Sequence, residues 1–198
     1  MKFIIKNHRS LFFILILSGL LIAGCKEGDG DADYRFAYIY MPQATVSGGL
    51  NNHYPVPSGA GVSTYNFKED NGKIHIYLGV LRSGLFSGAS GFTVNVSASS
   101  VLTEEAIASE EIASAMALPT ALYTLPDKAT VEPGQSSTSF FLSVDASILT
   151  DDTYAGKNLV LAVEISNPTR YELSDQNTSV VVVIDVEALK EREEEPGD

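Results

Sequence analysis

Lys73–Leu81 has the sequence KIHIYLGVL, and its pattern predicts a β-strand with one buried and one exposed face. Positions 74, 76 and 78 are aliphatic, whereas positions 73, 75 and 77 hold lysine, histidine and tyrosine. Successive side chains of a strand point to opposite faces of a sheet, so we expect the aliphatic set in a core. The turn pair Asn71-Gly72 directly before this stretch predicts a hairpin with Tyr65–Phe67.

Further strand patterns lie on both sides of this stretch. They cover residues 35–41, 92–98, 121–125, 139–145, 159–165 and 179–186. The last of them, SVVVVIDV, is apolar on both faces, which is typical of a central strand. About seven short strands with turn residues between them predict a mainly β fold, an antiparallel β-sandwich. Residues 35–41 and 92–98 are its expected edge strands.

One segment has a helical rather than a β composition. Thr103–Ala117 (TEEAIASEEIASAMA) is rich in alanine and glutamate, and Thr103 can cap the start of a helix. Glu104 and Glu105 would then lie in the first turn, where negative charge is favourable. We therefore expect one helical insertion, at about 103–117, that ends before Pro119.

The first 24 residues have the three parts of a secretory signal peptide. Lys2, Lys6 and Arg9 form a basic start, and Leu11–Ala23 is an apolar run. As a helix this run would span about 20 Å, which is short of the roughly 30 Å of a bilayer core. We therefore expect residues 1–24 to be cleaved off rather than to span a membrane.

Leu21–Cys25 (LIAGC) resembles the lipobox of bacterial lipoproteins, in which the cysteine is lipidated and becomes the new N-terminus. Cys25 is the only cysteine in the chain, so it cannot form an internal disulfide, and lipidation would consume its thiol. Several acyl chains, at about 0.8 kcal/mol per buried CH₂, would hold the protein on a membrane. We therefore predict a lipid anchor on Cys25.

The residues behind Cys25 predict a flexible acidic tether, 25–33, because KEGDGDAD has almost no apolar side chain. This run resembles the one behind the cysteine in Bacteroidetes lipoproteins that are sent to the cell surface. The resemblance implies an outer-membrane location that faces the exterior. Behind the tether we expect the sandwich domain at 34–187 and a charged tail at 188–198.

Asp29, Asp31 and Asp33 alternate within the tether and raise the alternative of a calcium loop. An EF-hand needs glycine at its sixth position and a carboxylate at its twelfth, where this chain has Tyr34 and Tyr40. We therefore predict neither a metal site nor a cofactor.

The chain carries a formal net charge of −12, and removal of the basic leader makes it more negative. This charge argues against nucleic acid and against anionic lipid surfaces as partners. Only His53 and His75 remain outside the leader, and no nucleophile elbow, metal-ligand spacing or phosphate loop is present. We therefore do not expect an enzyme.

Several motifs in a fixed order resemble a known family. They are YIYMPQA (38–44), LGVLRSG (78–84), YTLP (123–126), VEPG (131–134) and the closing segment LVLAVEISNPTRYELSDQNTSVVVVIDV (159–186). Together they resemble the Bacteroidetes lipoprotein domain called domain of unknown function 1735. The resemblance implies an immunoglobulin-like sandwich, commonly found in front of a glycoside hydrolase or a carbohydrate-binding domain. It carries over no catalytic residues.

The resemblance implies capture of glycans at the cell surface for polysaccharide uptake, without catalysis. Sugar sites combine aromatic faces with planar amides on loops. The best local match for such a site is the set Asn51, Asn52, His53, Tyr54, Tyr65 and Asn66. The alternative function is a scaffold that docks a partner protein, for instance a glycan-utilisation protein, in an outer-membrane complex. Capture requires a small concave patch with exposed tyrosine, whereas docking requires a broad apolar patch or an open edge strand.

Overall fold

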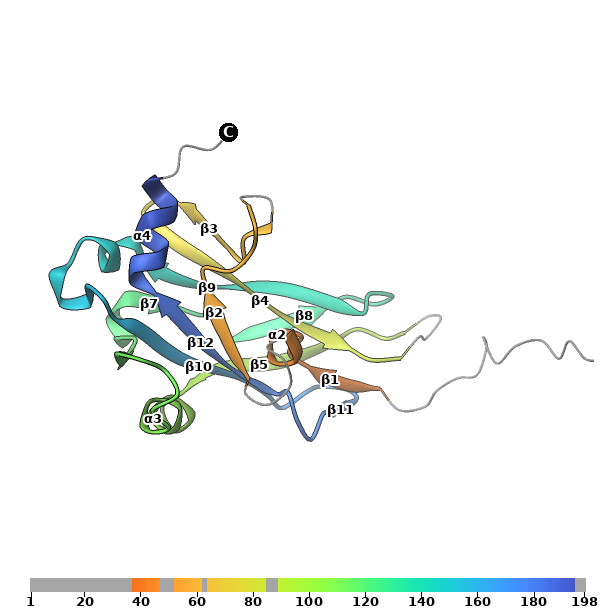
Figure 1. The fold of residues 1–198 in the computed structure, drawn as a ribbon. Coiled ribbons are helices and arrows are strands. Elements are labelled where there is room, and N and C mark those ends of the chain that lie inside the picture. Colours follow the sequence, from red (N-terminus) through yellow and green to blue (C-terminus); the bar gives the residue numbers. More distant parts are fainter. Residues whose placement is uncertain (1–36, 47–51, 62–63, 85–88, 195–198) are drawn as a thin grey trace, which may run out of the picture. The chain divides into compact units, whose positions relative to one another are not determined.

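Two β-sheets pack face to face in the computed structural model, which describes residues 37–46, 52–61, 64–84 and 89–194 (Figure 1). The first sheet contains β1 (Tyr38–Tyr40), β3 (Phe67–Asp70), β4 (Lys73–Arg82), β7 (Tyr123–Thr124), β9 (Ser137–Asp145) and β11 (Glu172–Leu173). The second contains β2 (His53–Val56), β5 (Phe92–Ser99), β6 (Ala115–Ala117), β8 (Lys128–Val131), β10 (Asn158–Ser166) and β12 (Ser179–Asp185). The helical elements are α2 (Gln43–Val46), α3 (Ser100–Ala108), η3 (Thr120–Leu122), η4 (Ala146–Leu149), η5 (Asp152–Tyr154) and α4 (Val186–Glu194).

The strand order is that of an immunoglobulin-like sandwich, which confirms the predicted fold. In the first sheet the order is β11-β1-β4-β9-β7, with β3 also paired to β4. In the second it is β2-β12-β10-β5-β8, with β6 also paired to β10. The runs β1-β4-β9-β7 and β5-β10-β12 correspond to the ABED and CFG sheets of that fold. The long ladders are antiparallel, but β1–β11, β2–β12 and β6–β10 are short parallel pairs, so both sheets are mixed.

The predicted edge strands are wrong. β1 lies between β11 and β4, and β5 lies between β10 and β8. In each case a short strand from a distant part of the chain covers the side that sequence alone leaves open. Among the described elements, the ends of the two sheet paths are instead the short strands β11, β7, β2 and β8.

The predicted hairpin is present as β3 and β4. Asn71 and Gly72 have φ values of 52° and 71°, the pair of positive angles that a type I′ turn requires. Ile74 and Ile76 are both 0% exposed, so the alternation of β4 puts its aliphatic residues between the sheets. They belong to one continuous core that both sheets share.

The helical insertion is confirmed, but it is shorter than predicted and begins earlier. Ser99 caps α3 by accepting a hydrogen bond from the Leu102 amide at 3.4 Å, and the helix ends at Ala108. Residues 109–117 were expected to continue it. Instead the chain turns, with a positive φ at Glu110 and at Ser114, and then forms β6.

The geometry of β10 explains this departure from helical propensity. Its neighbour β5 ends at Ser99, opposite Ala162, so the backbone of Asn158–Val160 lacks that partner. β6 pairs with this free stretch in parallel. Satisfying the hydrogen bonds of a central strand outweighs a helix preference of a few tenths of a kcal/mol per residue.

The helix α3 covers the outer face of the second sheet. Ala106 of the helix packs with Val160, Ala162 and Val181 in a second apolar cluster. Since β10 and β12 have the shared core on one side and this cluster on the other, both must be apolar on both faces. The predicted central position of residues 179–186 is therefore confirmed, with β12 between β10 and β2.

The sandwich continues into the segment expected to be a charged tail. Asp185 caps α4 by accepting a hydrogen bond from the Ala188 amide at 3.0 Å. Val186 and Leu189 are 0% exposed within the shared core. In the part of the chain that the structure describes, neither α4 nor any other helix is long and apolar enough to cross a bilayer.

Candidate functional site

Asn52 holds the strand β2 in place. Its side-chain amide donates to the Ser179 carbonyl at 3.1 Å and to the Ser179 hydroxyl at 3.2 Å. Its own carbonyl accepts from the Val181 amide at 2.9 Å. These bonds join β2 to β12, so Asn52 serves the sheet. Asn51, its predicted companion, lies outside the described residues.

Asn66 closes the loop between β2 and β3. Its side-chain oxygen accepts from the Ser58 amide and its side-chain nitrogen donates to the Pro55 carbonyl, both at 2.8 Å. Its backbone carbonyl accepts from the Tyr77 amide at 3.0 Å. An amide with both ends bonded to its own backbone has little capacity left for a ligand.

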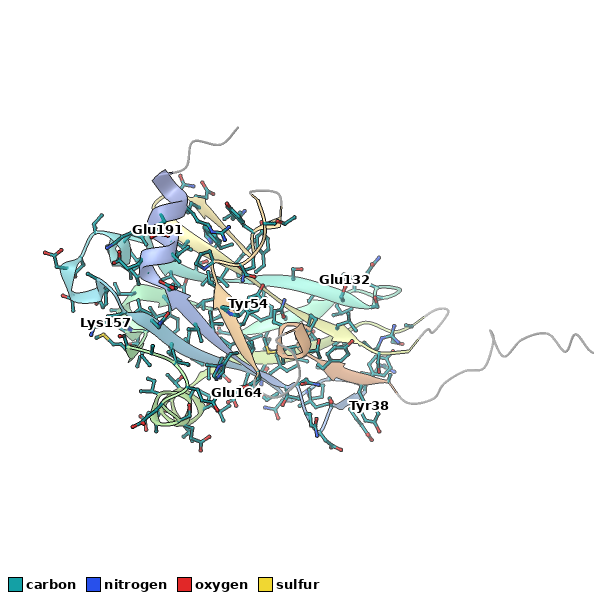
Figure 2. The ribbon with its side chains drawn as sticks, in the orientation of Figure 1. Tyr38, Tyr54, Glu132, Lys157, Glu164 and Glu191 are labelled. Carbon is teal, nitrogen blue, oxygen red and sulfur yellow. The ribbon has the colours of Figure 1, made fainter. Side chains whose placement is uncertain are left out.

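Tyr54 is half-buried and packs against the shared core. Burial raises the pKa of its phenol above 10.0, and a hydrogen bond with the Asn66 side chain opposes that shift. His53 precedes it in β2, half-buried and in register with Val181 of β12. Tyr54 on β2 (Figure 2) thus contacts Asn66, whereas Asn52 and His53 lie against β12, so most of the described members of the predicted set hold the loop and the sheet.

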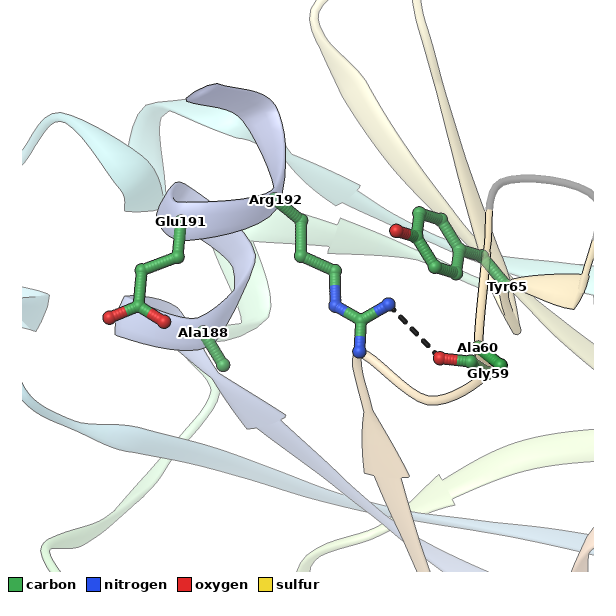
Figure 3. A pocket seen from close by; sticks show the side chains of 6 residues that line it. All are labelled: Gly59, Ala60, Tyr65, Ala188, Glu191 and Arg192. Atoms are coloured by element: carbon green, nitrogen blue, oxygen red, sulfur yellow. Dashed lines mark hydrogen bonds between the residues drawn. The ribbon is translucent and has the colours of Figure 1, made fainter. Parts of the chain in front are cut away.

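Tyr65 is the predicted residue that lines a pocket. The pocket is open, has a volume of about 360 Å³, and lies between the 57–66 loop and α4 (Figure 3). Its lining residues are Gly59, Ala60, Tyr65, Ala188, Glu191 and Arg192.

Arg192 fixes the geometry of this pocket (Figure 3). Its guanidinium lies over the Tyr65 ring, 4.5 Å from the ring centroid, and donates to the Gly59 carbonyl at 3.1 Å. Tyr65 also stacks on Phe67, with the ring centroids 5.5 Å apart. Gly59 has a φ of 113°, and a Cβ there would lie 2.4 Å from the Thr64 carbonyl oxygen, so the loop requires glycine at this position.

This arrangement suits the binding of a polar ligand. A guanidinium has five N–H donors, and Gly59 takes one of those of Arg192. Glu191 offers carboxylate oxygens on the same wall. Sequence reasoning missed Arg192 because it lies in the expected tail. The apolar spacing of Val186, directly before that charge run, and Leu189 within it is the pattern that indicates a packed helix.

The predicted lipidation site Cys25 and the tether, with its alternating aspartates, lie outside the described residues. Within the described ranges, no three His, Cys, Asp or Glu side chains gather closely enough to hold a metal ion.

A family model matches residues 38–172, about two thirds of the chain, and its description is "-like, N-terminal domain". No curated protein matches the chain. Three solved structures from Bacteroides ovatus resemble the fold at low sequence identity. One is a protein to which carbohydrate binding is ascribed: identity is 12%, the match covers 75% of this chain and 36% of that chain, and the TM-score is 0.50.

A second is a protein of unknown function, at 14% identity, covering 75% of this chain and 46% of that one, with a TM-score of 0.51. A third is a multidomain protein that includes domain of unknown function 1735, at 10% identity, covering 74% and 43%, with a TM-score of 0.49. The matched part of this chain thus spans less than half the length of each. At such identities the likeness concerns the fold.

Proposed function

Because a family model for an N-terminal domain matches residues 38–172, this chain belongs to a Bacteroidetes family of the type called domain of unknown function 1735. From that premise we propose that it binds glycans without catalysis at the cell surface. The observation that carries this proposal is the open pocket in which the Arg192 guanidinium lies over the Tyr65 ring, with Glu191 among the lining residues from α4. A multidentate donor and a carboxylate acceptor are groups with which proteins hold sugar hydroxyls, and the Tyr65 ring, stacked between Phe67 and Arg192, keeps the guanidinium in place. The carbohydrate binding ascribed to the Bacteroides ovatus protein of similar fold supports the same ligand class.

The proposed role is binding rather than hydrolysis. Glycoside hydrolysis commonly requires two carboxylates about 5–10 Å apart across the scissile bond. Among the described residues that line the pocket, Glu191 is the single carboxylate. The pocket therefore supports recognition, and an acid–base pair would have to come from elsewhere.

Membrane attachment is the second part of the proposal. A lipid on Cys25, with residues 26–33 as a tether, would place the domain in the outer membrane facing the exterior. Growth of the native bacterium with an alkyne-bearing fatty acid tests this: the full chain should carry the label, and a Cys25→Ala variant should not. An unlabelled native chain would refute the anchor and leave glycan binding unaffected.

Glycan binding is tested with the full chain purified in detergent, on a glycan array followed by calorimetry. The native chain should bind at least one glycan, and Tyr65→Ala and Arg192→Ala should weaken that binding. Tyr123→Ala is the matched control, because Tyr123 is likewise half-buried against the shared core but lies on β7. Absence of binding by a chain with a cooperative thermal transition would refute the function.

The alternative, a scaffold for a partner protein, finds less support in the fold. Of the large hydrophobic side chains in the described part, Tyr38, Tyr77 and Val101 are exposed, and they come from three separate elements. Both strands expected as docking edges are paired on either side. The observed features match a small ligand better than a broad interface.

A further inference from the structure

The outer face of the first sheet carries a group of rings on neighbouring strands. Tyr77 of β4 is paired across the ladder with Phe141 of β9, and their ring centroids lie 5.0 Å apart. His75, two residues earlier on β4, meets the same phenylalanine at 5.4 Å. These residues alternate with buried Ile74, Ile76 and Leu142, so they point away from the core. We call Tyr77, Phe141 and His75 the aromatic platform.

Within the platform, the Phe141 ring packs against the Tyr77 ring, and Tyr77 is exposed to solvent. Phe141 is half-buried, and the Lys68 ammonium lies over its ring at 4.8 Å from the centroid. The Tyr77 side chain is 37% exposed. In the pocket, by contrast, Arg192 already covers Tyr65 at 4.5 Å. Tyr77 therefore offers the more open ring face for stacking.

Polar groups of the right kind surround this ring. The Ser143 hydroxyl is hydrogen-bonded to Nδ1 of His75 at 2.8 Å. Ser139, exposed on β9, lies two residues from Phe141 on the same face. Lys68 of β3 is in register with His75, and its ammonium has three donors. Hydroxyl and ammonium groups around an apolar ring match a ligand whose faces are apolar and whose rim is made of hydroxyls.

The described outer face of the second sheet is different in character around β10 and β12. There α3 packs over Val160, Ala162 and Val181. Among the described helices, α3 packs mainly on strands of the second sheet and α4 on η4 and β12, while Gln43 of α2 accepts a hydrogen bond from the Gly79 amide at 3.2 Å, two residues from Tyr77. The two faces of one sandwich thus differ, one covered in part by a helix with apolar contacts and one carrying half-exposed rings.

The size of the platform indicates a small ligand rather than a protein. A tyrosine side chain has roughly 200 Å² of surface, so 37% exposure leaves on the order of 75 Å² on Tyr77. A specific protein interface needs about 800 Å² on each partner. One exposed ring with two supporting rings is far below this, but it suffices for one sugar ring.

The charges around the platform favour a neutral sugar as its ligand. Asp70 and Asp145 flank Lys73 in the next cross-strand row of the same face, and the whole chain carries −12. Both features oppose a polyanion. Lys68 donates to a hydroxyl as readily as it pairs with a carboxylate, so it does not require an acidic ligand.

We propose that the aromatic platform is a second glycan-contact surface, on which the apolar face of a neutral hexopyranose unit stacks against Tyr77 while Lys68 and Ser139 bond its hydroxyls. This inference rests on the proposed glycan-binding function and adds to it a ligand class and a surface apart from the pocket.

The test is calorimetry on the full chain in detergent with cellohexaose, laminarihexaose and mannohexaose, and with hexagalacturonate as the anionic counterpart. At least one neutral hexasaccharide should bind, and Tyr77→Ala should weaken it at least tenfold. Tyr77→Phe, which keeps the ring, should bind within threefold of the native chain. Tyr38→Ala is the matched control, because Tyr38 is 38% exposed but lies on β1, and it should bind as the native chain does.

Ser139→Arg keeps the test valid if Tyr77→Ala fails to fold. Residue 139 is exposed, so arginine can be accommodated there while it crowds the ring, and binding should again fall at least tenfold. Full binding by folded Tyr77→Ala or Ser139→Arg would overturn the platform. If Tyr65→Ala then abolishes binding, the proposed function stands with the pocket as its site.

Binding of hexagalacturonate alone would likewise overturn the platform's ligand class and leave glycan binding intact. A native chain that binds none of the four oligosaccharides would overturn the platform. The wider glycan array then decides separately whether the proposed function survives.

Discussion

Replacing Asn66 with alanine separates a structural from a ligand-binding role at the position where sequence reasoning expects a sugar contact. The Asn66 side chain accepts from the Ser58 amide and donates to the Pro55 carbonyl, each at 2.8 Å. Both partners belong to the segment that leads from β2 towards β3. The bonds therefore tie the loop behind the pocket to the start of the hairpin.

The expected cost follows from these two bonds. A hydrogen bond in a protein contributes about 0.5–1.5 kcal/mol net, so their joint loss should lower the free energy of unfolding by about 1–3 kcal/mol. For a domain of this size each kcal/mol corresponds to about 2–4 °C in Tm, so we expect Asn66→Ala to melt about 2–12 °C lower.

Urea titration followed by circular dichroism measures this change, with intrinsic tyrosine fluorescence as a second probe because the chain has no tryptophan. Asn95→Ala is the control: Asn95 is half-buried in β5, and among the described residues its side chain has no hydrogen-bond partner. The control should lose less than about 0.5 kcal/mol, as is usual away from special contacts. An Asn66→Ala chain that keeps native stability but loses glycan affinity would refute the reasoning.

Three further predictions concern the scaffold. Thr103→Val should lower the free energy of unfolding by about 1–3 kcal/mol in urea titration. The Thr103 hydroxyl accepts a hydrogen bond from the buried Ala162 amide at 2.9 Å, and valine leaves that N–H unsatisfied. An unchanged urea midpoint would contradict this prediction. Leu142→Ala, at 0% exposure in the shared core, should cost about 2–5 kcal/mol in the same assay, and a loss below 1 kcal/mol would mean that the site collapses around the cavity. Since burial raises the pKa of Tyr54 above 10.0, the folded state retains the phenol proton more strongly than the unfolded chain. That contribution to stability is present below pH 10 and is lost as pH rises through the folded pKa, so alkaline melting curves should fall more steeply for the native chain than for Tyr54→Phe.

Local sequence patterns were sufficient to predict those elements whose structure depends on a few adjacent residues. The alternation of Lys73–Leu81 and the Asn71-Gly72 pair predict β4 and its hairpin because side-chain period and turn geometry are properties of a few adjacent residues. The outward direction of the Phe141 side chain follows from the same rule. Its neighbours Phe140 and Leu142 are inward-facing, so the residue between them must point outwards.

The remaining elements could not be predicted from the sequence, because they depend on pairing between segments that are distant in the chain. Whether 103–117 stays helical depends on Asn158–Val160, whose backbone needs a partner after β5 ends at Ser99. The edge status of β1 and β5 depends on β11 and β8 in the same way. Such pairings change local preferences by more than the propensities differ, and sequence spacing alone contains no information on them.

The candidate site likewise depends partly on local sequence and partly on contacts between distant segments. Sequence composition selected a segment rich in asparagine and tyrosine, but residues 53–56 of it form the strand β2, and the amides of Asn52 and Asn66 are bonded to backbone groups. A loop that carries a site needs such internal bonds, since an unbound polar loop would lose too much entropy on binding. The groups left for a ligand are therefore those that α4 and the facing strands bring together, namely Tyr65 with Arg192 at the pocket and Tyr77 with Phe141 on the sheet. Both pairs join residues that are far apart in the sequence, which is why the rigid sandwich, rather than the loop alone, determines where the two proposed sites lie.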